Sequence, residues 1–122
     1  MFLRLAHTQL GIFQASRSLC LECYKITKLF PTDEKFAMVQ QIRRAALSVH
    51  LNIAEGSSRK SATERKRFYE ISRGSVIEID TALDIAVSLE YCTENSLTDL
   101  GEKLVTTFKQ LSALINYKKH NT

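Results

Sequence analysis

Apolar residues recur at intervals of three and four along most of the chain, in four consecutive segments. This spacing places the apolar side chains of each segment on one face of a helix, and no strand-like alternation competes with it. The short connections favour an antiparallel up-down-up-down four-helix bundle, with residues 1–122 forming one domain. The pattern therefore predicts an all-α fold with helices over about 4–29, about 34–55, from Ser61 to about 92, and from Ser96 through Ile115.

Residues that favour helix ends separate these segments. Thr32 or Asp33 is expected to cap the second helix, because a short polar side chain can accept a hydrogen bond from the first free backbone N–H groups. Gly56 is expected to end this helix with a positive φ. Ser61 opens a Ser-x-x-Glu capping box for the third helix, and Ser96 is expected to cap the fourth.

The third helix has a long apolar stripe with a tyrosine beside it. Tyr69 falls at the rim of this stripe, and a rim position explains it more simply than stacking on a nucleic-acid base. The residues predicted to face the core are Phe68, Ile71, Ser75, Ile79, Ala82, Ala86 and Leu89.

The second helix carries more apolar surface than one core requires. At about 100° per residue, a second apolar face lies well away from the main stripe of this helix, with Arg43 and His50 between the two. A surplus apolar face commonly marks a partner, although a wider core seam is the simpler alternative. We favour self-association through Phe36, Leu47, Leu51 and Ala54.

Three cysteines raise the question of metal or redox chemistry. Cys20 and Cys23 form a Cys-x-x-Cys pair, which occurs in zinc sites and redox centres. Their spacing also places both thiols on the inner stripe of the first helix, where a free cysteine behaves as a small apolar residue. The three histidines are scattered, and a zinc site needs two more ligands. We therefore expect buried thiols, with no metal and no cofactor.

Composition bounds the protein class. An apolar content of 44% with 25% charged residues is that of a globular protein, and no apolar run approaches the roughly 18 residues of a membrane span. Arg4, His7 and Gln9 interrupt the N-terminal apolar segment, so no secretory signal is expected. A cytoplasmic protein is the expectation.

The charges are strongly segregated along the chain. Residues 43–73 hold eight basic and three acidic residues, whereas residues 78–102 hold seven acidic residues and no Lys or Arg. Bases near the start of the third helix interact unfavourably with the helix dipole, so helix stability does not explain their position. Binding of a polyanionic partner explains it better. The alternative is a solvated charged face. In an antiparallel bundle, the candidate nucleic-acid-binding residues share one end: Arg59, Lys60, Arg65, Lys66, Arg67, Lys118 and Lys119.

The sequence offers no catalytic constellation. A nucleophile beside a base, paired carboxylates or a phosphate-cradling glycine loop would be needed, and none is visible. Arg43 and Asn52 flank the stripe of the second helix, and Glu78 lies at the edge of that of the third. Because a half-buried charge requires a partner, we expect an Arg43–Glu78 ion pair with Asn52 nearby, which would set helix register.

The stretch QIRRAALSVHLNIAEGSSRKSATERKRFYEISRGSVIEID resembles the four helix bundle protein family, first described in intervening sequences of bacterial 23S rRNA genes. The resemblance covers most of the chain and implies a homopentameric ring without known enzymatic activity. A relative with the same fold is the retroelement accessory protein, a basic ring that binds nucleic acid and a reverse transcriptase. The structural signature residues are Arg43, Asn52, Glu55, Gly56 and Glu78.

Two functional hypotheses remain from the sequence. The first is a non-enzymatic, oligomeric protein that contacts the backbone phosphates of structured RNA or DNA through its basic end. The second is a protein-interaction scaffold, or an accessory factor for an enzyme such as a reverse transcriptase, without direct contact to nucleic acid. Charge placement alone does not separate them, since an acidic protein surface presents the same charge sign as phosphate.

Overall fold

The computed structural model describes residues 1–117 and contains four long helices. No strand occurs within these residues, so the predicted all-α class is confirmed. None of the described helices combines the length and apolar content needed to cross a bilayer. The α-helices are α1 (Gly11–Thr27), α2 (Met38–Ser57), α3 (Ala62–Ser88) and α4 (Thr98–Asn116), and the short 3-10 helices are η1 (Ala6–Gln9), η2 (Thr32–Glu34) and η3 (Asn95–Leu97).

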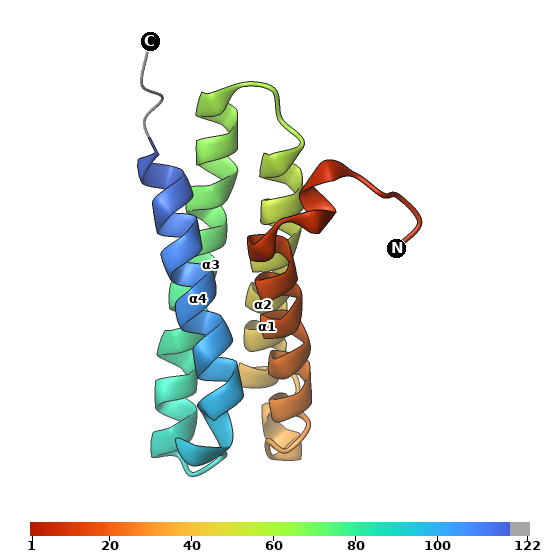
Figure 1. Ribbon diagram of the computed structural model, residues 1–122. Coiled ribbons are helices and arrows are strands. Elements are labelled where there is room, and N and C mark those ends of the chain that lie inside the picture. Colours follow the sequence, from red (N-terminus) through yellow and green to blue (C-terminus); the bar gives the residue numbers. More distant parts are fainter. Residues whose placement is uncertain (118–122) are drawn as a thin grey trace.

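The four helices form a bundle in which each packs against two neighbours. Helix α1 packs against α2 and α4, and α3 packs against the same two helices from the other side. In Figure 1 the α2–α3 connection lies at the end of the bundle where α1 begins and α4 ends, whereas the α1–α2 and α3–α4 connections lie at the opposite end. This arrangement brings the start of α3 beside the end of α4.

The core is formed by apolar stripes of all four helices. Cys23 and Ile53 are fully buried, together with Leu19, Ala46 and Val49. Burial raises the pKa of the Cys23 thiol to about 12, with smaller contributions from Cys20 and Glu22. Because a thiolate is disfavoured there, Cys23 acts as a packing residue.

Helix α1 begins at Gly11, later than the predicted start near residue 4. Residues 1–5 precede η1 without helical structure, and the Thr8 hydroxyl donates a hydrogen bond to the carbonyl of Leu5 (2.7 Å). The side-chain amide of Gln14 in turn donates to the carbonyl of Thr8 (2.9 Å). These local bonds satisfy the backbone in a tight turn, which replaces the first predicted turns of the helix.

Helix α2 also begins later than predicted, at Met38, and neither Thr32 nor Asp33 caps it. Both residues belong to η2, and the residue that precedes α2 makes no side-chain capping bond. The Glu34 carboxylate instead accepts a hydrogen bond from the backbone N–H of Met38 (3.3 Å) and a second from the Tyr91 hydroxyl (2.7 Å). Glu34 therefore ties the start of α2 to the α3–α4 connection.

Gly56 lies inside α2, and no described glycine has a positive φ. The predicted left-handed cap at Gly56 is therefore wrong. A Cβ at this position would lie 2.9 Å from the Cβ of Phe68 and 3.0 Å from a ring carbon of Tyr69, closer than carbon atoms pack. Glycine is needed because α2 and α3 approach each other closely at this point.

The orientation of α3 differs from the prediction at its first turns. Tyr69 is buried and its hydroxyl lies 3.0 Å from the Ser57 hydroxyl, whereas Phe68 is half-buried and Ile71 is exposed. In these turns the residue directly after the predicted one therefore faces the core, so Tyr69 takes the place of Phe68. The Ser61 cap is confirmed, since its hydroxyl accepts a hydrogen bond from the N–H of Glu64 (3.2 Å).

Two further sequence predictions fail. Ser96 does not cap α4, because its hydroxyl donates to the carbonyl of Thr93 (2.7 Å) within the preceding turn. The predicted Arg43–Glu78 ion pair does not form, because Arg43 reaches α1 instead, where it donates to the Thr27 hydroxyl (2.9 Å).

Glu78, on α3, and Asn52, on α2, make their hydrogen bonds with residues other than Arg43. The Gln41 side-chain amide donates a hydrogen bond to the Glu78 carboxylate, and Asn52 donates to the carbonyl of Ser48 one turn earlier (2.8 Å). The Ser75 hydroxyl also donates to that of Ser48 (2.9 Å). The Gln41–Glu78 and Ser75–Ser48 hydrogen bonds link α2 to α3, whereas the Asn52 bond stays within α2.

Candidate functional site

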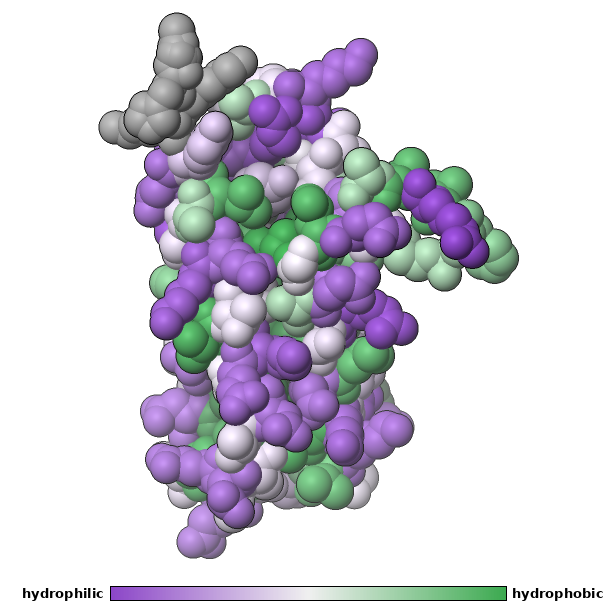
Figure 2. Space-filling model, in the orientation of Figure 1, coloured by the Kyte–Doolittle hydropathy of each residue, from purple (hydrophilic) through white to green (hydrophobic). Residues whose placement is uncertain are grey.

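The candidate site is the end of the bundle that carries the α2–α3 connection. We call it the basic end and define it by Arg59 and Lys60 in the connection and Arg65, Lys66 and Arg67 in the first turns of α3. All are exposed except Arg65, which is half-buried. The other two predicted residues, Lys118 and Lys119, lie outside the described part of the chain. In Figure 2 hydrophilic residues lie at the top of the molecule, apolar ones gather below them, and the projecting N-terminal arm carries both kinds.

Arg59 is paired but remains on the surface. Its guanidinium lies 2.7 Å from the Glu55 carboxylate, and the two side chains are 42% and 54% exposed. It also stacks over the Phe68 ring at 4.9 Å from the ring centre. An exposed pair of this kind contributes about 0–1 kcal/mol and is screened by salt, so a phosphate can compete with Glu55 for Arg59.

Arg65 holds the connection in shape. Its Nη1 donates hydrogen bonds to the carbonyl oxygens of Arg59 (2.9 Å) and Lys60 (2.7 Å). These carbonyls follow the end of α2, where the helix itself supplies no donors. Arg65 is therefore a structural residue of the turn as well as a source of positive charge.

Three unpaired cations remain at the basic end: Lys60, Lys66 and Arg67. Within residues 1–117 their side chains make no hydrogen bond or ion pair, and the ion pair found in that part of the chain joins Arg59 to Glu55. An exposed cation without a partner retains its full charge for an incoming anion.

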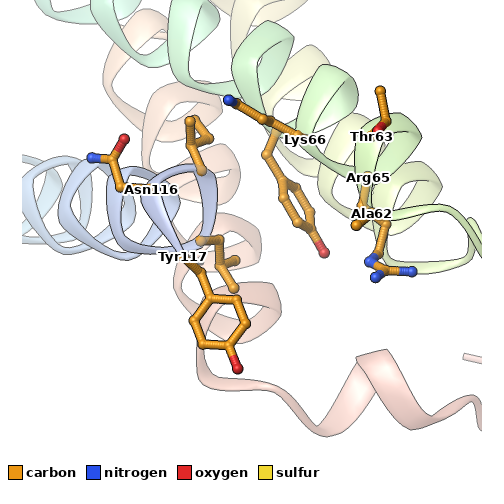
Figure 3. Close-up of a pocket in the computed structure, with 9 residues that line it drawn as sticks. Ala62, Thr63, Arg65, Lys66, Asn116 and Tyr117 are labelled. Carbon is orange, nitrogen blue, oxygen red and sulfur yellow. The ribbon is translucent and has the colours of Figure 1, made fainter. Parts of the chain in front are cut away.

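A hollow of about 440 Å³ lies at the basic end, between the start of α3 and the end of α4. Figure 3 shows Lys66 extending from α3 toward Asn116, with Tyr117 on the α4 side of the hollow. The guanidinium of Arg65 lies beside the first turn of α3. The hollow therefore combines cations from one helix with an aromatic ring and an amide from the other.

Sequence reasoning missed Tyr117 and assigned Tyr69 to the rim. Tyr69 is buried, and it lines the hollow from the α3 side. Tyr117 is 72% exposed. Its position immediately before Lys118 and Lys119 is the signal that could have identified it, since an aromatic residue beside basic ones is typical of nucleic-acid contacts.

Acidic residues occupy the opposite end of the bundle. Within the described residues, the α1–α2 and α3–α4 connections contain or adjoin several exposed carboxylates. The charges are therefore segregated along the bundle, although Lys28 and Lys35 offset part of the negative charge at this end. The acidic residues at that end are Asp33, Glu34, Glu90, Glu94, Asp99 and Glu102.

Of the predicted interface residues, Leu47, Leu51 and Ala54 lie on α2, whereas Phe36 precedes this helix, so the predicted helical face does not include it. Phe36 is 80% exposed and Leu51 is 57% exposed, while Leu47 is 40% exposed and Ala54 is half-buried. Ala54 packs against the core, whereas a wider core seam would also have buried Leu47 and Leu51. The face is therefore available for a partner.

A serine–histidine pair lies beneath the surface between α1 and α2. The Ser16 hydroxyl is 2.7 Å from Nδ1 of His50, and the imidazole packs 4.4 Å from the Phe13 ring centre. Burial lowers the pKa of His50, and the positive charges of Arg17 and His7 lower it further. Because Ser16 is fully buried, a substrate cannot reach its hydroxyl, and the pair serves packing.

Metal ligation has no support in the described residues. Within residues 1–117 no three His, Cys, Asp or Glu side chains gather as metal ligands would. Cys20 and Cys23 are both buried on α1, and Cys92 is half-buried. The Cys-x-x-Cys spacing is therefore part of the core stripe.

Comparisons with known proteins agree with this architecture. The family model described as 23S rRNA-intervening sequence protein matches residues 8–113. A crystal structure from Bacteroides thetaiotaomicron, described as a protein with unknown function from the S23 ribosomal protein family, superposes with a TM-score of 0.77. It shares 20% sequence identity, and the match covers 87% of this chain and 99% of that chain. No curated protein matches.

Proposed function

Because this chain belongs to the 23S rRNA-intervening sequence protein family, we propose that it is a non-enzymatic, oligomeric protein that binds nucleic acid through its basic end. The proposed ligand is structured RNA or DNA, contacted through its backbone phosphates. The proposed compartment is the cytoplasm.

The observation that carries this proposal is the group of unpaired cations. Lys60, Lys66 and Arg67 are exposed and make no ion pair within residues 1–117, although acidic residues are plentiful elsewhere on the same chain. Segregation of this kind maintains a positive potential at one end of the molecule. Phosphate groups are the common polyanionic partners of such a surface.

The helix dipole strengthens the argument. Arg65 lies in the first turn of α3 beside Glu64, and a base there opposes the helix dipole by about 0.3–1 kcal/mol, whereas Lys66 and Arg67 follow in the second turn, where this effect fades. A solvated face has no reason to concentrate bases at that position. An anionic ligand makes the electrostatic interaction at this end favourable, because it is attracted both by the bases and by the helix N-terminus.

Fluorescence anisotropy over a salt series tests the proposal directly. Binding of structured RNA and of duplex DNA should weaken linearly with log salt, each neutralised phosphate adding about 0.7–0.9 to the slope. Charge reversal of Lys66 and Arg67 to Glu should weaken binding and flatten this slope. Arg65 is unsuitable for this variant, because it also holds the α2–α3 connection.

A matched control reverses two exposed lysines away from the basic end. The Lys28→Glu, Lys103→Glu variant changes the net charge by the same amount, at positions outside the proposed surface. It should bind nearly as tightly as the wild-type protein. Equal loss in both double variants would attribute binding to net charge, and the absence of wild-type binding at low salt would refute the proposal.

We propose further that antiparallel bundles assemble into a homopentameric ring. The support is the family resemblance together with Leu47 and Leu51 exposed on α2, Phe36 exposed before it, and the half-buried Ala54 beside them. A ring would present one basic end per subunit, so several weak phosphate contacts would act together.

The second candidate function is a protein-interaction scaffold. The same apolar face favours it, since a protein partner can cover this face in place of a second copy. An accessory role for a partner enzyme, such as a reverse transcriptase, is the form that the resemblance suggests. Failure of RNA and DNA binding combined with a stable protein complex would favour this candidate.

A further inference from the structure

We propose that the hollow between α3 and α4 holds one unpaired nucleotide, with its base stacked on Tyr117 and its phosphate against Lys66. This inference rests on the proposed nucleic-acid function and specifies the substrate class of the basic end. It predicts a preference for RNA or DNA with unpaired residues over continuous duplex.

Tyr117 provides the surface for stacking. The residue leaves the helical conformation, with φ −64° and ψ 127°, and its side chain is 72% exposed. The ring contributes little to the core, so no packing role accounts for an aromatic residue here. An exposed ring beside cations matches the way in which proteins bind single-stranded nucleic acid, because every base presents a face for stacking.

Lys66 provides the nearest unpaired positive charge. It lines the hollow opposite α4 and extends toward Asn116 in Figure 3. Its ammonium makes no hydrogen bond or ion pair with any described residue. Arg65 lines the same hollow, and its Nη1 donates to the turn, whereas Nε and Nη2 make no hydrogen bond with the described residues.

The other lining groups and the volume of the hollow suit a single base but not a nucleic-acid duplex. Asn116 is exposed, and its amide can both donate to and accept from a base edge. The volume of about 440 Å³ falls within the range of about 300–1,000 Å³ typical of small-ligand sites. A duplex is too wide for this space, because its bases are paired and stacked inside, so only an extruded or unpaired nucleotide can enter.

A Tyr117→Trp variant gives a direct test, since the chain contains no tryptophan and the new side chain is a unique fluorophore. We expect a short single-stranded RNA to quench this fluorescence through stacking and a fully paired RNA duplex of the same length to quench it little. Binding measured by anisotropy should remain close to the wild-type value for both RNAs.

A Tyr117→Ala variant should lose about tenfold in affinity for the single strand, which corresponds to stacking of one base. Its affinity for the duplex and its salt slope should be unchanged. Circular dichroism provides the folding control, and Tyr117→Phe should retain wild-type binding because the ring is preserved.

The outcomes of these experiments distinguish the nucleotide site from the proposed nucleic-acid binding on which it rests. Equal loss on single strand and duplex, or Trp quenching that is the same for both, would overturn the nucleotide site and leave electrostatic binding intact. Failure of the wild-type protein to bind either RNA at low salt would overturn the proposed function as well.

Discussion

Gly56 of α2 faces Phe68 of α3 at a separation that leaves no room for a side chain. A Cβ on Gly56 would lie 2.9 Å from the Cβ of Phe68, and the buried ring of Tyr69 closes the remaining space. Neither neighbour can withdraw cheaply, because Phe68 Cβ is fixed to its backbone and Tyr69 belongs to the core. The two helices therefore approach each other closely directly before the basic end.

Gly56→Ala should destabilise the protein by about 1–3 kcal/mol, because overpacking outweighs the gain in helix propensity. Urea denaturation measures the effect. The control is Gly74→Ala in α3, where a Cβ would meet no atom within 4 Å. That variant should be stabilised by about 0.5–1 kcal/mol, as expected for glycine in a helix interior. Equal stabilisation in both variants would contradict the close approach.

Arg65→Ala should destabilise the protein by about 0.5–1.5 kcal/mol, because the exposed carbonyls of Arg59 and Lys60 each lose a charged donor that water replaces only in part. Lys66→Ala, one residue further along α3, removes the same formal charge without breaking a hydrogen bond and should leave stability nearly unchanged. Thermal unfolding followed by circular dichroism compares the two. Indistinguishable melting temperatures would remove the structural role assigned to Arg65.

Leu51→Glu should shift the protein toward the monomer, because it places a charge in the proposed interface. Light scattering should give a wild-type mass several times 13.9 kDa and a variant mass close to that value, with helical content preserved. Ile77→Glu on α3 is the control, since Ile77 is also about half exposed but lies outside this face. A wild-type monomer at micromolar concentration would eliminate self-association.

His50 should make stability depend on pH. Its pKa is lowered below 6.5 in the folded state, so the unfolded chain binds more protons as the pH falls through that value. The resulting loss in the free energy of unfolding is absent above pH 6.5. It grows as the pH falls toward the pKa of His50 in the folded state, and it is constant below that pKa. Arg17 and His7 contribute to the lowering after burial. Urea titrations above and below pH 6.5 should show this loss, and His50→Gln should reduce it.

The number and sequence of the helices could be predicted from the sequence, because a stripe of apolar residues at intervals of three and four has no other stable way to be buried. The stripes of α1 and α2 confirm this, with Cys23, Ala46 and Ile53 all fully buried. The grouping of bases near one connection could also be predicted, since charge and chain order are both written in the sequence.

Other properties depended on how the helices pack together. From the sequence, Arg43 could pair with Glu78 or reach α1. The rotation of α2 about its axis directs Arg43 to the Thr27 hydroxyl of α1. Gly56 could serve a turn or a close approach, and the position of Phe68 selected the approach. Tyr69 entered the core in place of Phe68 because the start of α3 is rotated by one position relative to its apolar pattern.

The hollow at the basic end is the clearest case of a feature that only the tertiary structure decided. Lys66 and Tyr117 are separated by most of α3 and all of α4, and no local pattern relates them. Their proximity results from the way the bundle returns the end of α4 to the start of α3. The sequence determined which residues are apolar, charged or helical, whereas the packing of the helices determined which of them lie together, because contacts between distant residues depend on helix rotation and approach.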